Sequence, residues 1–164
     1  MRTQQELIYF FEHSFVELMN QIHEDLKAKW GTMDAHRMVE HLTLGFKIAN
    51  GKIRIPEAEL DPRSPKLKRL FLLSDKPLPK DFQNPILPKG LSAYENESLK
   101  LAIQKLLAEV AAFIDYFKMN PEDESLIHNL FGNLNYHEWL WFEYKHVMHH
   151  MMQFGIVPFS EIIE

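Results

Sequence analysis

The chain has 164 residues, of which 46% are apolar and 25% charged, so length and composition predict one globular domain over residues 1–164. A formal net charge of -5 without a basic block argues against a nucleic-acid partner, and the absence of cysteine excludes disulfides, thiolate nucleophiles and cysteine-rich zinc sites. The N-terminus lacks a signal-peptide pattern and no apolar run reaches the roughly 20 residues of a membrane span, so we expect a cytoplasmic protein without a membrane partner.

Two amphipathic helix patterns occupy the first part of the chain. Residues 3–29 carry an apolar side chain every three or four positions and predict one long helix with a stripe for the core. Residues 33–50 predict a second helix, with Thr32 as its N-cap and the pair Asn50–Gly51 as its stop.

A long connection, from about Gly51 to Leu91, follows and holds most of the prolines. A short helix over residues 65–73 is expected to interrupt it. Structureless loops of this length are uncommon and are often functional lids or disordered segments. In and near this connection the aromatic side chains of Phe71, Phe82 and Tyr94 could cover a pocket or seal the end of the helices, and we favour sealing.

Two more helices are predicted in the second half. The third is expected over residues 92–120, opened by a capping box of Ser92 and Glu95. The fourth is expected over residues 136–155, with Glu138 in its first turn. Two helices, a long crossover and two further helices predict an all-α fold with the plan of a four-helix bundle.

Histidine is abundant, with nine copies, and four of them are expected to be ordinary surface or partly buried residues: His13, His23, His36 and His128. His146 and His150 differ because they are four residues apart and lie on one face of the fourth helix, together with Trp139, Phe142 and Gln153. Two polar rings in an apolar stripe need a shared partner, and a divalent metal ion is one explanation. The spacing alone is also compatible with histidines that hydrogen-bond inside a packed core.

The second helix offers a third candidate ligand, His41, on a face that is mainly apolar toward its C-terminal end. Gly45 lies one turn further on, at a cost of about 1 kcal/mol relative to alanine. A position without a side chain either leaves room for water or substrate or allows close helix packing, and both interpretations stay open. His149 lies off the face of His146 and His150; it is expected to support the site or to lie at a helix boundary, and it is the substitute ligand for His150.

Known metal motifs are excluded or incomplete. The residues between His146 and His150 do not form the HExxH motif of a zincin, and Glu143 with His146 supplies one Glu-x-x-His pair where a di-iron bundle has two. Three protein ligands with an open position are typical of a catalytic and not of a closed structural site.

The segments around these histidines resemble a known superfamily. Trp30, an inward histidine on the next helix, a long crossover and His-x-x-x-His on the last helix are similar to the DinB/YfiT-like superfamily. Residues 131–139 (FGNLNYHEW) and 145–155 (KHVMHHMMQFG) resemble its DUF1569 branch. The resemblance implies an up-down-down-up four-helix bundle, frequent homodimers, and a metal held by His41, His146 and His150. Its characterised members include transferases that use glutathione, mycothiol or bacillithiol, a maleylpyruvate isomerase, and ligand-binding or stress-induced proteins.

Two classes of function stay open. A metal-dependent transferase or hydrolase would use zinc, nickel or iron to polarise a small-molecule substrate, or to activate a water or a low-molecular-weight thiol. Glu143 or His149 could orient a group or accept a proton, and Arg37 could clamp an anion or form a salt bridge with Asp34 or Glu40. The alternative is a non-catalytic metal- or ligand-binding stress-response protein, in which a fourth protein ligand closes the site.

The fourth helix is also apolar away from its ligand face. Two further apolar stripes run along it, formed by Trp141, Tyr144 and Met148 and by Leu140, Val147 and Met151. Because a four-helix bundle does not easily cover every side of one helix, this pattern predicts a homodimer.

Overall fold

The computed structural model describes residues 1–80 and 93–158, and most of this part of the chain is helical. The all-α class is therefore confirmed in its general form. The elements in chain order are α1 (Gln4–Tyr9), a π-helical turn (Phe10–Ser14), α2 (Phe15–Met19), α3 (Ala35–Ala49), a 3-10 turn (Glu57–Glu59), α4 (Ser64–Leu67), a second π-helical turn (Lys68–Leu72), α5 (Leu99–Met119), β1 (Ile127–His128), β2 (Gly132–Asn133) and α6 (Tyr136–Gln153). Strands β1 and β2 pair antiparallel, a small hairpin that the sequence pattern did not predict.

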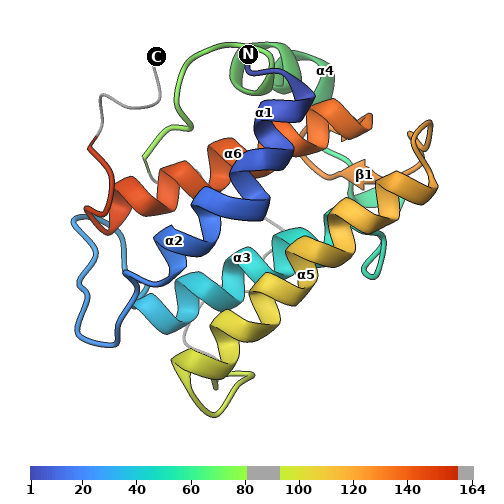
Figure 1. Cartoon of the computed structure of the whole chain (residues 1–164). Coiled ribbons are helices and arrows are strands. Elements are labelled where there is room, and N and C mark those ends of the chain that lie inside the picture. The colour runs from blue at the N-terminus through green and yellow to red at the C-terminus, as the bar shows by residue number, and fades with distance from the viewer. Residues whose placement is uncertain (81–92, 159–164) are drawn as a thin grey trace.

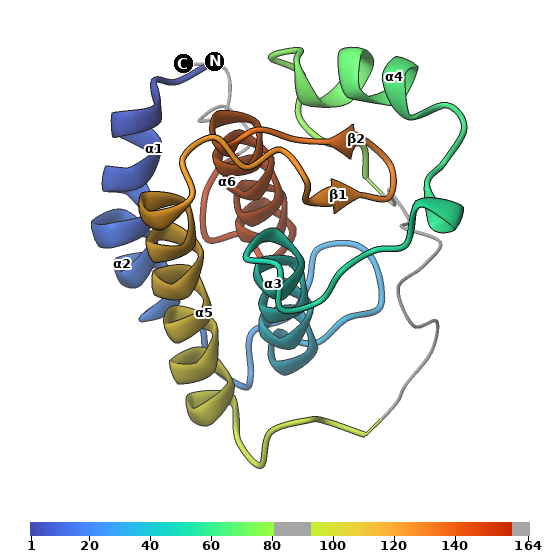
Figure 2. The same ribbon diagram turned by 90° about the vertical axis from the view of Figure 1, so that its right-hand side faces the viewer.

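The helices surround one apolar core, in which α3 packs against α5 and both α1 and α3 pack against α6 (Figures 1 and 2). Its centre is a cluster of phenylalanine rings from three parts of the chain, with ring centroids 5.6 to 6.5 Å apart: Phe11, Phe15, Phe46 and Phe113. All four rings are almost completely buried. Such edge-to-face contacts add to the gain from burying apolar area and fix α3 in place.

The first helical segment is shorter than expected, because it ends at Met19 and not at Lys29. Ile22 and Leu26 continue the apolar spacing, yet they pack on the core from an irregular loop. This loop is tied to the end of α6, where the backbone N–H of Lys29 donates to the carbonyl of Gln153 at 2.7 Å. The periodic pattern predicted burial correctly and helix wrongly, since apolar side chains are buried by packing on the core whether the backbone that carries them is helical or irregular.

Two helix starts also differ from the prediction. Helix α3 is capped by Asp34, whose carboxylate accepts a first-turn N–H at 2.8 Å, and not by Thr32. Helix α5 is capped by Ser98, so the capping box assigned to Ser92 and Glu95 is wrong, and Ser92 itself lies outside the described residues. In both helices a side-chain oxygen a few residues further along the chain, from Asp34 or Ser98, accepts a backbone N–H of the first turn that has no partner within the helix.

The remaining boundaries agree with the sequence. Gly51 has a φ of +75°, a left-handed conformation that glycine adopts at low cost, and α3 stops just before it. Helix α6 starts at a complete capping box, in which Asn135 accepts from the N–H of Glu138 at 2.9 Å and Glu138 accepts from the N–H of Asn135 at 3.0 Å. The short helix predicted for residues 65–73 corresponds to residues 64–72.

Helix α6 is covered on nearly every side within one chain. Trp141, Tyr144 and Met148 are each at most 5% exposed. The indole of Trp141 donates to the carbonyl of Leu72 at 2.8 Å, and the ring of Phe10 packs edge-on to Tyr144. The uncovered stripes that led us to expect a homodimer are therefore not present, and the homodimer stays a prediction. No helix in the described part of the chain is long and apolar enough to cross a membrane.

The segment 64–72 is held on α6 by a buried lysine. The Lys145 side chain is 1% exposed, and its Nζ donates to the carbonyls of Phe71 and Ser74, the latter at 2.8 Å. Burial lowers the pKa of Lys145 to about 8. Phe71 is partly buried against the core and is not among the described residues of the cavity wall, whereas Phe82 lies outside the described residues.

Replacing Lys145 with methionine keeps most of the apolar stem and removes the donor for both carbonyls. We expect Lys145→Met to lower the free energy of unfolding by about 2–4 kcal/mol, because the buried carbonyls lose their partner. Urea unfolding at pH 7 measures this loss. Lys118→Met, at a largely exposed position, is the control and should stay within about 0.5 kcal/mol of the parent. A Lys145→Met protein as stable as this control would contradict the anchoring role.

Candidate metal centre

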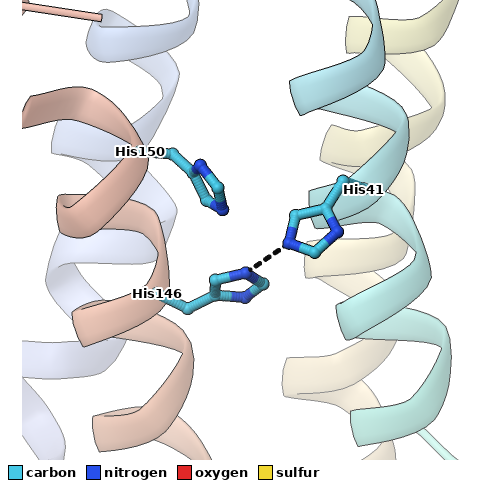
Figure 3. Close-up of side chains that lie close together, drawn as sticks. All are labelled: His41, His146 and His150. Atoms are coloured by element: carbon cyan, nitrogen blue, oxygen red, sulfur yellow. Dashed lines mark hydrogen bonds between the residues drawn. The ribbon is translucent and has the colours of Figure 1, made fainter. Parts of the chain in front are cut away.

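The predicted histidines come together where α3 faces α6. His41 extends from α3 toward His146 and His150 of α6, and one nitrogen from each ring lies within 4.8 Å of the others (Figure 3). The Nε2 atoms of His41 and His146 are 2.8 Å apart. The structure therefore confirms that the three predicted imidazoles form one cluster.

Gly45 shows why the two helices meet so closely here. A Cβ atom at this position would lie 3.4 Å from both carboxyl oxygens of Glu143 and 3.5 Å from Cε1 of His146. Gly45 also forms part of a cavity wall. Close helix packing and open space beside the ligands, the two interpretations of Gly45, therefore both apply. The missing side chain lets Glu143 lie against α3, and it leaves the histidines open toward the cavity.

Gln153 fixes which nitrogen of His150 is free. The amide Nε2 of Gln153 donates to the carbonyl of Trp30 at 2.9 Å, and its Oε1 lies 2.8 Å from Nδ1 of His150. Because an amide oxygen only accepts, Nδ1 of His150 carries the ring proton and Nε2 keeps its lone pair. Metal-binding histidines are typically held in this way by a protein acceptor on the second nitrogen.

Glu143 lies beside His146 in the same manner, although less tightly. Its Oε2 is 3.5 Å from Nδ1 of His146, while Oε1 has no hydrogen-bond partner among the described residues. The side chain is completely buried, and burial raises the pKa of this carboxyl well above its usual value. A buried carboxyl with an unsatisfied oxygen beside the imidazole of His146 is an environment that a bound cation would stabilise.

The imidazoles are held in their neutral form. Burial, reinforced for His41 by the neighbouring histidines, lowers the pKa of His41 to about 3 and that of His146 to about 4. Burial and the same neighbours lower the pKa of His150 well below its usual value. Neutral rings offer lone pairs, so the donor set fits a divalent first-row ion.

The spacing of the rings would have to change in both directions to hold an ion, because the three ligand nitrogens spread over as much as 4.8 Å while one pair is at 2.8 Å. Two ligand nitrogens around a tetrahedral zinc ion, at about 2.0–2.1 Å from it, are roughly 3.4 Å from each other. The 2.8 Å between His41 and His146 is a hydrogen-bond distance, so binding would part these two rings by about half an ångström.

The cluster opens onto a cavity of about 320 Å³. The loop that carries Trp30 and Thr32 forms one side of this cavity. The other described lining residues are Gly31, Met33, Gly45, Ile48, Leu78, His128, Leu130, Trp139, Phe142, His149 and Gln153. None of these described residues is an aspartate, glutamate, lysine or arginine, so the described wall is apolar apart from its imidazoles, one hydroxyl, one amide and the indole N–H groups of Trp30 and Trp139, which have no hydrogen-bond partner among the described residues.

His149 and Arg37 have more peripheral positions. His149 lines the cavity and packs edge-on to Trp30 with ring centroids 6.0 Å apart, but it does not join the three-nitrogen cluster. The Arg37 guanidinium lies over the ring of Tyr94 at 4.6 Å, and the Tyr94 hydroxyl donates to Asp34. Neither Arg37 nor Tyr94 is among the described residues of the cavity wall, so the anion-clamp interpretation of Arg37 has no geometric support.

His128 is the site residue that the sequence reasoning missed. It was expected to be an ordinary surface or partly buried residue, yet it is 6% exposed and lines the cavity from β1. Its ring stacks on Phe131 and packs edge-on to Phe142. The signal in the sequence was the apolar residues on either side of the pair His128–Asn129, namely Leu126, Ile127, Leu130 and Phe131, but its use would have required the hairpin to be predicted as well.

No protein-family model, curated protein or solved structure matches this chain. The DinB/YfiT-like assignment therefore stays a prediction from the sequence pattern.

The lowered histidine pKa values predict how stability depends on pH in the metal-free protein. Between about pH 4 and 6.5 the unfolded chain binds more protons than the folded chain, so the free energy of unfolding falls as the pH falls through this window. Each such histidine contributes a slope of up to about 1.4 kcal/mol per pH unit. Urea unfolding at several pH values measures the slope, and His41→Gln should flatten it. An unchanged slope in this variant would show that His41 is not held neutral.

Proposed function

We propose that this chain is a metal-dependent enzyme that acts on a small molecule, with a divalent ion held by His41, His146 and His150. The observation that carries the proposal is that the three imidazoles meet at the wall of a cavity and not in a closed shell. Three protein ligands with space beside them leave an ion a position for water or substrate. When bound, the ion would supply Lewis acidity and a lowered pKa for an attached water or thiol.

The protein residues around the cluster support this role. Gln153 and Glu143 hold the rings of His150 and His146 from behind, which keeps the lone pairs aimed at one point. His149 lies near the cluster but outside it, so the described residues do not close the shell with a fourth ligand. This favours an enzyme over the alternative, a non-catalytic metal- or ligand-binding stress-response protein.

The finer parts of the proposal come from the sequence resemblance. We assign the fold to the four-helix bundle of the DinB/YfiT-like superfamily, DUF1569 branch. The reaction would be a transfer or a hydrolysis, with zinc, nickel or iron as the ion. A low-molecular-weight thiol is a candidate cosubstrate, because the chain has no cysteine of its own. A homodimer in the cytoplasm completes the proposal.

Metal content is the direct test. The protein is purified without chelator and its metal measured by mass spectrometry, beside His41→Ala, His146→Ala and His150→Ala. We expect nearly one ion per chain in the parent and its loss in all three variants. Gln153→Ala removes the partner of the His150 ring and should weaken metal affinity by about 10- to 100-fold.

His149→Ala is the matched control, since it removes a neighbouring imidazole that lies outside the cluster, and it should keep its metal. If His149→Ala loses the metal and His150→Ala keeps it, the third ligand is His149 and not His150. A folded parent that neither contains metal nor takes up zinc, nickel or iron would contradict the proposal.

A further inference from the structure

His128 has a defined hydrogen-bonding state. Its Nδ1 accepts the backbone N–H of Leu130 at 3.2 Å. A backbone N–H can only donate, so Nδ1 carries no proton and the ring must carry one on Nε2. The Nε2–H group is therefore a hydrogen-bond donor, and it has no partner among the described residues.

The orientation of this donor is fixed by aromatic packing. The ring centroid of His128 lies 4.6 Å from that of Phe131, 4.4 Å from that of Phe142 and 5.8 Å from that of Trp139. These contacts leave the imidazole little freedom to turn, and the hairpin holds its backbone. Burial lowers the pKa of His128 to about 3, so the ring is an uncharged donor at neutral pH.

The cavity around His128 is suited to an uncharged ligand. Aromatic and aliphatic side chains form most of its described wall, among them Trp30, Leu78 and Phe142. In the metal-free cavity a charged molecule would lose its hydration without gaining an ion pair from any described lining residue. The volume of about 320 Å³ is at the lower end of the range for small-molecule sites.

We propose that the cavity binds a small, uncharged, mainly aromatic molecule with a carbonyl oxygen, and that the Nε2–H of His128 positions this oxygen. This inference rests on the proposed function in taking the cavity as the substrate site. It does not depend on a bound metal, because the donor belongs to β1 and its state is set by Leu130.

The test compares two probes of matched shape, acetophenone and ethylbenzene, of which the first has the carbonyl oxygen. Dissociation constants are measured by protein NMR titration, with the as-purified and with chelator-treated protein. The quantity of interest is the ratio of the ethylbenzene constant to the acetophenone constant, compared between parent and variants. The free energy needed to take each probe out of water is the same for the parent and for every variant. It therefore cancels when the ratio of one protein is compared with that of another.

We expect His128→Phe to lower this ratio by about 5- to 10-fold, the effect of one neutral hydrogen bond, while the aromatic packing remains. His128→Gln replaces the ring with a flexible amide donor and should restore part of the ratio. The control His149→Phe changes another imidazole of the same cavity wall and should leave the ratio within twofold. A ratio unchanged in His128→Phe, or lowered in His149→Phe instead, would overturn the assignment.

A second readout needs no variant. In the parent, acetophenone should shift the Nε2–H resonance of His128 and ethylbenzene should not. Absence of that shift at saturation, or failure of both probes to bind, would also overturn the proposal. Because the chelator-treated protein gives the same readouts, these failures are distinguishable from a failure of the metal measurement.

Discussion

The structure depends on one costly arrangement, three imidazoles enclosed between α3 and α6. Taking polar rings out of water is unfavourable unless each finds partners, and here the partners come from both helices and from the loop behind them. His41 and His146 share a hydrogen bond, and His150 bonds Gln153, which in turn bonds the backbone at Trp30. Gly45 gives Glu143 and His146 room against α3, and the loop at Trp30 supplies the carbonyl that holds Gln153.

The sequence predicted what depends on local periodicity and capping. The spacing of His146 and His150 places both on one face of any helix, and the Asn135–Glu138 box marks where α6 starts. His41 was found because its face is apolar. The predictions for single helix faces succeeded because a helix relates residues that are three or four positions apart. That His41 would join His146 and His150 was implied by the family resemblance.

What the sequence did not predict depends on contacts between distant segments. The loop after Met19 keeps a helical apolar spacing because Ile22 and Leu26 are buried by tertiary packing. The exposure of α6 was misjudged because segment 64–72, anchored by Lys145, covers a side that four helices would leave open. His128 reaches the site through a two-residue strand pair, which has no strong local signature.

The described site has two kinds of polar group with separate tasks. The cluster on α3 and α6 presents lone pairs, while His128 on β1 presents an N–H. An electron-pair acceptor such as a metal ion suits the first, and an acceptor oxygen of a ligand suits the second. This division accounts for a cavity whose other described walls are mainly apolar, because a few fixed polar groups are enough to orient a small molecule.

X-ray absorption spectroscopy of the zinc-loaded protein tests the central claim most directly, because it counts the imidazoles around the ion. We expect three imidazole nitrogens and one further oxygen or nitrogen atom at about 2.0–2.1 Å, and one imidazole fewer in His41→Ala. A spectrum without imidazole scattering, or one unchanged in His41→Ala, would contradict a metal centre shared by α3 and α6.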